Sequence, residues 1–241
     1  MDSEPKIGFK KILLIVAGLI ALSAMALAID IDITKQRRSD FISGDFRRII
    51  SLSEIFAHGF GIAIALYLVW ALKPEKRRWI PRLAACAILP GLACQFIKLF
   101  VGRFRPGQYF PNYADSVEQT WVGILPSGQL NFEYVTQSFP SAHAATAIGL
   151  CIGLVWMLPQ CRVLFISLAM LASIQRVVAG AHWMSDIFAG AAISVLVCGL
   201  VFHHRRMNKL FSTIENPKPE NQSPAIQISD SEDQPEHSKA A

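Results

Sequence analysis

Charged residues are scarce in this chain of 241 residues: they make up 17% of it, against 52% hydrophobic residues, and the mean hydropathy is +0.37. Too few polar side chains remain to cover a globule of this size, which excludes a disordered chain and an ordinary soluble domain. The chain also lacks C-x-x-C and Cys/His metal spacings. Its five cysteines are therefore expected to be small core residues, not metal ligands or disulfide partners.

The apolar residues are concentrated in six runs that contain no Asp, Glu, Lys or Arg. Eighteen helical residues reach about 27 Å, roughly the thickness of the hydrocarbon core of a bilayer. We therefore predict an all-α bundle of six transmembrane helices. The runs are Ile12 to Ile29, Ile55 to Leu72, Leu83 to Ile97, Ala142 to Leu158, Val163 to Ile174 and Ile187 to Phe202.

The first run has two readings. Lys6, Lys10 and Lys11 precede it and it ends in Ala26-Leu27-Ala28, which resembles a secretory signal with a small-residue cleavage site. The run is, however, longer than the 7 to 15 residues typical of a signal peptide. We expect it to be a retained helix.

The orientation follows from Lys and Arg in the short connections. With the N-terminus inside, the inside segments hold twelve of these residues and the outside segments nine, and the bias is strongest between Lys73 and Arg82. This predicts a multi-pass protein of the plasma or inner membrane with both termini in the cytoplasm. The net charge of +5 is then a membrane-flank effect, and no nucleic-acid partner is expected.

The last 30 residues differ in composition from the rest of the chain. Residues 212–241 are rich in Ser, Pro, Gln and Asn and hold six acidic residues against two Lys. Such a segment cannot bury enough apolar surface to fold alone. We predict a membrane domain over residues 1–211 and a disordered, acidic cytoplasmic tail over residues 212–241.

Three polar clusters interrupt the membrane pattern. They run from Lys98 to Pro106 after the third helix, from Pro140 to His143 before the fourth, and from Arg176 to Asp186 between the fifth and sixth. In an alternating six-helix bundle all three face one side, which the charge bias makes extracytoplasmic. Ionisable residues at such places usually mark function.

The cations in these clusters suit a phosphate group. Lys98, Arg105 and Arg176 bring three positive charges toward one surface, which matches a phosphate dianion and the charge on its oxygens during transfer. Ser141 lies where a helix N-cap is expected. The amides of Ala142 and the residue after it would then face an anion together with the positive end of the helix dipole.

Two histidines and a carboxylate could perform the chemistry. His182 and Asp186 are four residues apart, so in a helical turn the carboxylate would accept the Nδ1 proton and leave Nε2 free as a nucleophile. His143 could protonate the leaving oxygen. One histidine must be neutral and the other protonated, which predicts a bell-shaped pH dependence.

Each of these residues has an ordinary alternative when taken alone. Lys98, Arg103 and Arg105 could be interfacial anchors, the histidines could be satisfied interior residues, and Asp186 could be a helix N-terminal acid. Their common side and ordered spacing favour a site.

The three clusters together resemble the type 2 phosphatidic acid phosphatase (PAP2) superfamily. The matching pattern is K-x6-RP at Lys98 to Pro106, PSxH at Pro140 to His143 and R-x5-H-x3-D at Arg176 to Asp186, within a region of about residues 50–205. The resemblance implies a six-helix membrane phosphatase that needs no metal. It also implies that His182 is the nucleophile, Asp186 its orienting partner and His143 the general acid, while the phosphate is held by Lys98, Arg105, Ser141, Ala142 and Arg176.

Two residues depart from the usual pattern. Ala142 replaces the Gly of PSGH, which keeps the amide donor, and Gln175 replaces the usual Ser before Arg176. The second change removes a small hydroxyl that could support phosphate binding.

The expected activity is hydrolysis of a lipid phosphate or lipid pyrophosphate at the outer leaflet through a phosphohistidine, with the bilayer as partner. A lipid phosphotransferase, or a non-enzymatic lipid or anion transporter, would use the same charges. The lipid is left open among phosphatidate, phosphatidylglycerophosphate, a polyprenyl pyrophosphate and the lipid A phosphates. The aromatic segment Gly107 to Gln137 is expected to shape the substrate entrance, or simply to cover the interface.

Overall fold

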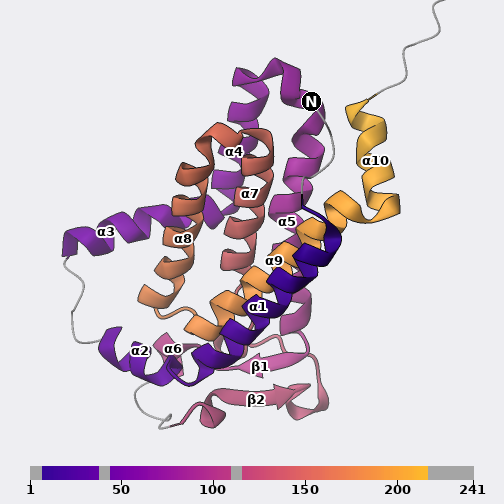
Figure 1. Cartoon of the computed structure of the whole chain (residues 1–241). Coiled ribbons are helices and arrows are strands. Elements are labelled where there is room, and N and C mark those ends of the chain that lie inside the picture. The colour runs from indigo at the N-terminus through magenta and orange to yellow at the C-terminus, as the bar shows by residue number, and fades with distance from the viewer. Residues whose placement is uncertain (1–6, 38–43, 110–115, 217–241) are drawn as a thin grey trace, which may run out of the picture.

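The computed structural model describes residues 7–37, 44–109 and 116–216 and is mostly helical (Figure 1). In the described part, the α-helices are α1 Phe9–Leu27, α2 Asp30–Arg37, α3 Gly44–Leu52, α4 Gly59–Leu72, α5 Ile80–Lys98, α6 Pro106–Tyr109, α7 Ala142–Met157, α8 Arg162–Val178, α9 Met184–His203 and α10 Arg205–Glu215. Two short strands, β1 Val101–Arg103 and β2 Trp121–Ile124, pair antiparallel.

Four of the described helical segments are long and apolar enough to cross a membrane: Phe9–Leu27, Pro74–Lys98, Pro159–Val178 and Met184–His203. A fifth counts if Gly44–Ala57 and Gly59–Leu72, which meet at a bend of 68°, form one span. The remaining predicted run forms α7, which has only 16 residues. The chain is thus a multi-pass helical membrane protein, and four or five spans meet the length criterion where the sequence predicted six.

Helix α7 lies at the centre of the bundle and packs against α5, α8 and α9. Its contact with α5 requires a glycine, because a Cβ on Gly149 would come within 2.1 Å of the carbonyl oxygen of Cys86. Leu83, Leu150 and Met157 are buried beside this crossing. This close packing fixes the position of α7 in the bundle. The second polar cluster lies at the start of α7.

Helix α1 lies along α9 (Figure 1). Ile12 and Val16 pack against Ala192 of α9, and the Ser23 hydroxyl donates a 2.8 Å hydrogen bond to the carbonyl of Ser185 at the start of that helix. In this fold the first apolar run is an integral layer of the bundle.

Helix α10 extends past residue 211, the last residue of the predicted membrane domain. It continues to Glu215, four residues beyond the predicted last folded residue at 211. The reason is a buried ion pair: Glu215 accepts two hydrogen bonds, of 2.6 and 2.8 Å, from Arg82 of α5. Phe211 is buried beside Cys198 and Phe202. The rest of the expected tail, from residue 217 on, lies outside the described residues.

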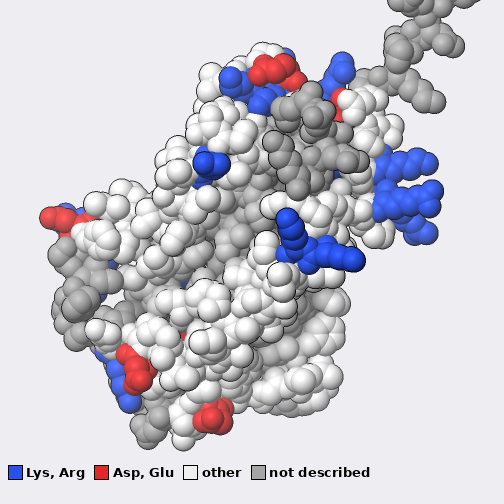
Figure 2. All heavy atoms as spheres, in the orientation of Figure 1, with Lys and Arg blue, Asp and Glu red and all other residues white. Residues whose placement is uncertain are grey.

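The β1–β2 hairpin lies at the opposite end of the bundle from α10 (Figure 1). Strand β2 lies in the segment Gly107 to Gln137, and β1 lies just before that segment. Phe132 and Tyr134 of this segment are exposed, while Phe110 and Tyr113 lie outside the described residues. Figure 2 shows Lys and Arg gathered around the upper end of the bundle and over α10, with a largely uncharged face below them.

Candidate active site

The three polar clusters meet at the end of the bundle that carries the hairpin. The N–H of Ser141 at the start of α7 donates a 3.1 Å hydrogen bond to the carbonyl of Asp186 in α9. The N–H of Gly107 donates to the carbonyl of Gly180 at 2.7 Å, and the indole of Trp183 donates to the carbonyl of Phe104 at 2.7 Å. The first and second clusters are therefore each hydrogen-bonded to the third.

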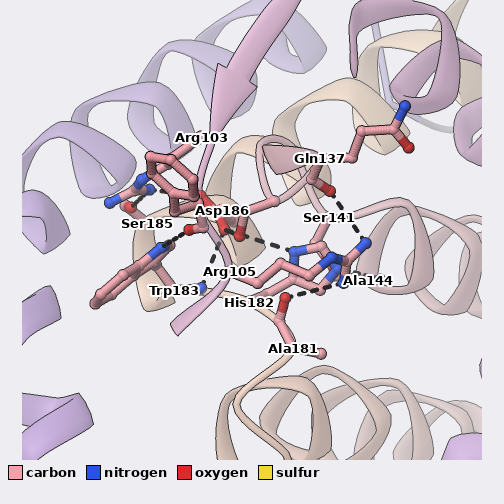
Figure 3. Close-up of polar contacts among 12 residues, drawn as sticks. Arg103, Arg105, Gln137, Ser141, Ala144, Ala181, His182, Trp183, Ser185 and Asp186 are labelled. Atoms are coloured by element: carbon pink, nitrogen blue, oxygen red, sulfur yellow. Dashed lines mark hydrogen bonds and ion pairs between the residues drawn. The ribbon is translucent and has the colours of Figure 1, made fainter. Parts of the chain in front are cut away.

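His182 and Asp186 face each other, but His182 precedes α9 and does not lie in the helical turn that the four-residue spacing predicted (Figure 3). Nδ1 of the histidine lies 3.5 Å from Oδ2 of the carboxylate, an ion-pair distance that is long for a hydrogen bond, and the side chains are 1% and 0% exposed. The same Oδ2 accepts hydrogen bonds from Ser138 Oγ at 2.6 Å and from the N–H of Trp183 at 3.0 Å. The carboxylate thus has a fixed orientation.

His182 lies between α8 and α9 and is neutral at physiological pH. Burial lowers its pKa to about 3, and the opposing effect of Asp186 does not offset that. The positive charges of Lys98 and Arg105 act in the same direction as burial. A neutral imidazole with one nitrogen toward a carboxylate is the state that a histidine nucleophile requires.

Arg105 is a cation of the candidate site and also hydrogen-bonds to the surrounding backbone. Its guanidinium donates to the backbone carbonyls of Tyr134, Gln137 and Ala181 at 2.9 to 3.1 Å. Burial lowers its pKa from the ordinary value, but an arginine remains protonated. Three of its five N–H groups are used in this way, which leaves two for a ligand beside His182.

Lys98 ends α5 and is 3% exposed. Among the described residues, it takes part in none of the hydrogen bonds or ion pairs found. It lies within electrostatic range of both His143 and His182. A buried ammonium group in electrostatic range of two histidines is suited to an anion.

Arg176 is held by a residue that the sequence did not single out. Its Nη1 donates to Glu54 Oε1 and, at 3.1 Å, to Gln175 Oε1. The Nε2 of Gln175 donates to the other oxygen of Glu54 at 3.0 Å. Gln175, at the position where the resemblance leads one to expect Ser, thus bonds to both Glu54 and the arginine. The Nε of Arg176 is buried without a hydrogen-bond partner.

Ser141 is the N-cap of α7, as predicted, and its Oγ accepts from the N–H of Ala144 at 3.3 Å. Ala142 follows as the first helical residue. His143 lines a cavity of about 350 Å³ whose polar lining also includes His58, Gln95 and Thr146. The remaining lining residues are mostly apolar and come from α4, α5 and α7.

In the described part of the chain, no three His, Cys, Asp or Glu side chains gather in a group that could hold a metal ion. The groups available to a ligand are donors and cations, which match an oxyanion.

Sequence reasoning missed the residues that surround Asp186. Arg103, which the sequence suggested only as a possible interfacial anchor, is 0% exposed and donates to Asp186 Oδ1 at 2.5 Å. Asp30 and Ser138 were not considered. A signal for Asp30 existed, since an acidic residue directly after an apolar run is costly unless it is paired.

A family model described as "PAP2 superfamily" matches residues 79–210, more than half of the chain, and includes all three polar clusters. The chain belongs to the PAP2 superfamily. Asp30 and Glu54 lie outside the matched region of this PAP2 protein.

Two curated relatives carry the name lipid A 1-phosphatase. One, from Rhizobium etli, is 32% identical over 146 residues, which cover 54% of this chain and 58% of the relative. The other, from Rhizobium johnstonii, is 30% identical over 125 residues, which cover 48% and 47%. The PAP2 chain thus spans about half the length of the curated relatives that it matches.

A solved structure of a transmembrane PAP2-type phosphatidylglycerolphosphate phosphatase from Bacillus subtilis has the same fold. The TM-score is 0.51 at 17% identity, and the match covers 80% of this chain and 93% of the other. At this level of identity the similarity concerns the fold alone.

Proposed function

We propose that this PAP2 protein is a lipid phosphatase that removes a phosphate through a phosphohistidine intermediate. The observation that carries the proposal is the buried pair of His182 and Asp186, 3.5 Å apart, beside the cations Lys98 and Arg105. The pair supplies a neutral, oriented nucleophile, and the cations compensate the charge of a phosphate.

In the first step, Nε2 of His182 attacks phosphorus and forms the P–N bond while the P–O bond to the lipid breaks. His143 gives its proton to the departing lipid oxygen. Asp186 stabilises the positive charge that the imidazole ring gains when Nε2 bonds to phosphorus. Lys98, Arg105 and Arg176, with the amides at the start of α7, bind the phosphoryl oxygens.

In the second step, a water molecule attacks phosphorus and gives a proton to His143, which now acts as the base. The P–N bond breaks, and inorganic phosphate leaves with His182 neutral again. Together the two steps return the site to its starting state, and neither step uses a cofactor.

A glycolipid phosphate is the first substrate to test. The curated relatives are named for the 1-phosphate of lipid A, and the cavity beside His143 offers His58, Gln95 and Thr146 to the hydroxyl and amide groups of a sugar. Its apolar wall, with Ile62, would lie along the acyl chains.

We further propose that all six apolar runs cross the bilayer, the shorter α7 with help from its flanking residues. The Lys and Arg bias would place both termini in the cytoplasm of the plasma or inner membrane and the site on the extracytoplasmic side. The accessibility of cysteines introduced at residue 73 and in the β1–β2 hairpin, measured in intact cells, tests this orientation.

The direct test is phosphate release by the full-length protein in detergent with EDTA present. Lipid A 1-phosphate, phosphatidate, phosphatidylglycerophosphate and a polyprenyl pyrophosphate form the panel. We expect release from at least the glycolipid, and trapping of phosphate on His182 after rapid acid-free quenching. Transfer of labelled phosphate to an alcohol acceptor would indicate a phosphotransferase, and binding without any turnover would contradict the proposal.

A further inference from the structure

Asp186 is joined to a second buried carboxylate, which belongs to the N-terminal part of the chain. Asp30 starts α2, directly after the first apolar run, and its side chain is 0% exposed. One guanidinium lies between the two acids: Arg103 donates from Nη2 to Asp30 Oδ2 at 2.8 Å and from Nη1 to Asp186 Oδ1 at 2.5 Å. The site therefore includes a residue from outside the family-matched region.

The guanidinium has little freedom to move. Its Nε donates to Thr120 Oγ1 at 3.2 Å, and its carbon lies 4.5 and 5.2 Å from the ring centres of Trp121 and Trp183. Ser185 closes the arrangement, since its hydroxyl donates to Asp30 at 2.5 Å and accepts from Arg103 at 2.7 Å. A planar fork fixed in this way sets the plane of the carboxylate that it binds.

The two oxygens of Asp186 are divided between two tasks. Oδ1 is taken by Arg103, so that Oδ2 is left for Ser138, the Trp183 amide and His182. Figure 3 shows Arg103 and His182 on opposite sides of the carboxylate. The orientation of His182 thus depends on Arg103, which in turn is oriented by Asp30.

Asp30 also changes the net charge of the buried group around Asp186. A buried Arg103–Asp186 pair alone is neutral, and the cation would cancel much of the field of Asp186 at His182. With Asp30 the group holds one positive and two negative charges, a net charge of −1 in a place that is closed to water. That charge favours the imidazolium character which His182 acquires as the P–N bond forms.

We propose that Asp30, acting through Arg103, is a positioning residue that orients Asp186 and maintains its negative field at His182. The N-terminal segment would then contribute to the rate of phosphoryl transfer and not only to membrane anchoring. The inference rests on the proposed role of His182 as nucleophile, but not on the identity of the lipid.

The matched variants are Asp30→Asn, which removes the charge and keeps the shape, and Asp32→Asn, an exposed acid on the same helix. Each is prepared as the full chain in detergent. Two readouts are used: kcat and KM on the lipid phosphate, and the Kd of orthovanadate, which resembles the trigonal transition state and bonds to a histidine. Thermal unfolding and the monodisperse fraction give the amount of folded protein.

For Asp30→Asn we expect kcat per folded molecule to fall roughly tenfold or more with KM within about twofold, and vanadate to bind roughly tenfold more weakly. Asp32→Asn should match the wild type, and Asp30→Glu should recover part of kcat because it restores the charge. A purely structural role would instead change the folded fraction and leave kcat per folded molecule intact.

Wild-type kcat and vanadate affinity in Asp30→Asn would overturn the proposal, as would a loss explained entirely by unfolding. If the wild type binds vanadate but hydrolyses none of the lipids, the proposed function fails, and the vanadate comparison still decides the role of Asp30. If the wild type does neither, both ideas are wrong.

Discussion

The backbone N–H of Ser141 donates a 3.1 Å hydrogen bond to the backbone carbonyl of Asp186. This bond joins the N-terminus of α7, where a phosphate would bind, to the turn of α9 that carries the nucleophile's partner. The two helices also touch directly one turn further along α9, at Gly190. The part of the site proposed to bind phosphate and the part proposed to hold the nucleophile are therefore joined by backbone contacts.

Gly190 makes this contact possible, and replacing it by Ala should damage the site. A Cβ at residue 190 would lie 2.4 Å from the carbonyl oxygen of Ser141, which is backbone and cannot rotate away. We expect Gly190→Ala to lower kcat/KM at least about tenfold, since a displacement near 1 Å at reacting groups has effects of this size or larger. The control is Gly18→Ala in helix α1, where the added Cβ would meet nothing within 4 Å. Equal activity of the two variants would show that α9 can move without consequence.

His182→Ala should abolish turnover and Asp186→Asn should lower kcat by about 10³, with little change in lipid binding. The first removes the proposed nucleophile, and the second removes the charge that orients it and stabilises its cationic form. Both are measured as initial rates of phosphate release, with His204→Gln, an exposed histidine at the other end of α9, as the control. Turnover by His182→Ala at the wild-type rate would require a different mechanism.

The parts of this site that could be predicted from sequence are those defined by local spacing. Lys98 at a helix end and Ser141 at an N-cap follow from helix geometry alone. The sequence placed His182 beside Asp186 by a helical four-residue step, but His182 lies in the turn before α9, and the shape of that turn brings the two together. Long-range partners could not be predicted. Asp30 is separated from Asp186 by 156 residues, and the pairing depends on how α1 and α2 pack against α9.

Composition likewise could not predict how some of the helices begin and end. Uninterrupted apolar composition located every run, but it could not show that a 68° bend falls inside the second run, between Ala57 and Gly59, or that α7 is short. Polar composition suggested that folding ends at residue 211. A single pairing, Glu215 with Arg82, extends α10 against that composition.

Glu215→Ala should destabilise the protein strongly although the residue lies far from the site. Its removal leaves Arg82 buried among aromatic rings without a counter-charge, and breaking a buried ion pair of this kind typically costs about 3 to 5 kcal/mol. The measurement is thermal unfolding in detergent. Thr213→Ala, exposed on the same helix, should have no comparable effect. A midpoint unchanged by Glu215→Ala would mean that α10 does not need this pair.

Glu54→Gln should strengthen phosphate binding. The carboxylate of Glu54 pairs with Arg176, so a phosphate that binds Arg176 as proposed must compete with Glu54 for the same guanidinium. The pair is partly exposed, so its contribution is at most about 1 kcal/mol, and we expect inorganic phosphate to inhibit roughly two- to fivefold more tightly. Glu75→Gln, an exposed acid in a different connection, is the control. Weaker inhibition in Glu54→Gln would instead indicate that Glu54 positions Arg176 for the substrate.

The low pKa of His182 predicts a one-sided pH dependence. Its folded pKa of about 3 is set mainly by burial and lies below the ordinary value of 6.5. The nucleophile therefore stays neutral between pH 5 and 9. The acidic limb that protonation of His182 would produce should therefore be absent when kcat/KM is measured across this range.

The same shift makes folding stability depend on pH. The unfolded chain binds a proton at His182 below about pH 6.5 and the folded chain does not, so stability is lost progressively as pH falls from there toward 3. The slope from this one group approaches about 1.4 kcal/mol per pH unit. His182→Gln, which cannot titrate, should show a shallower decline in its unfolding midpoint between pH 6.5 and 4. Identical declines in the two proteins would mean that folding does not lower the pKa of His182.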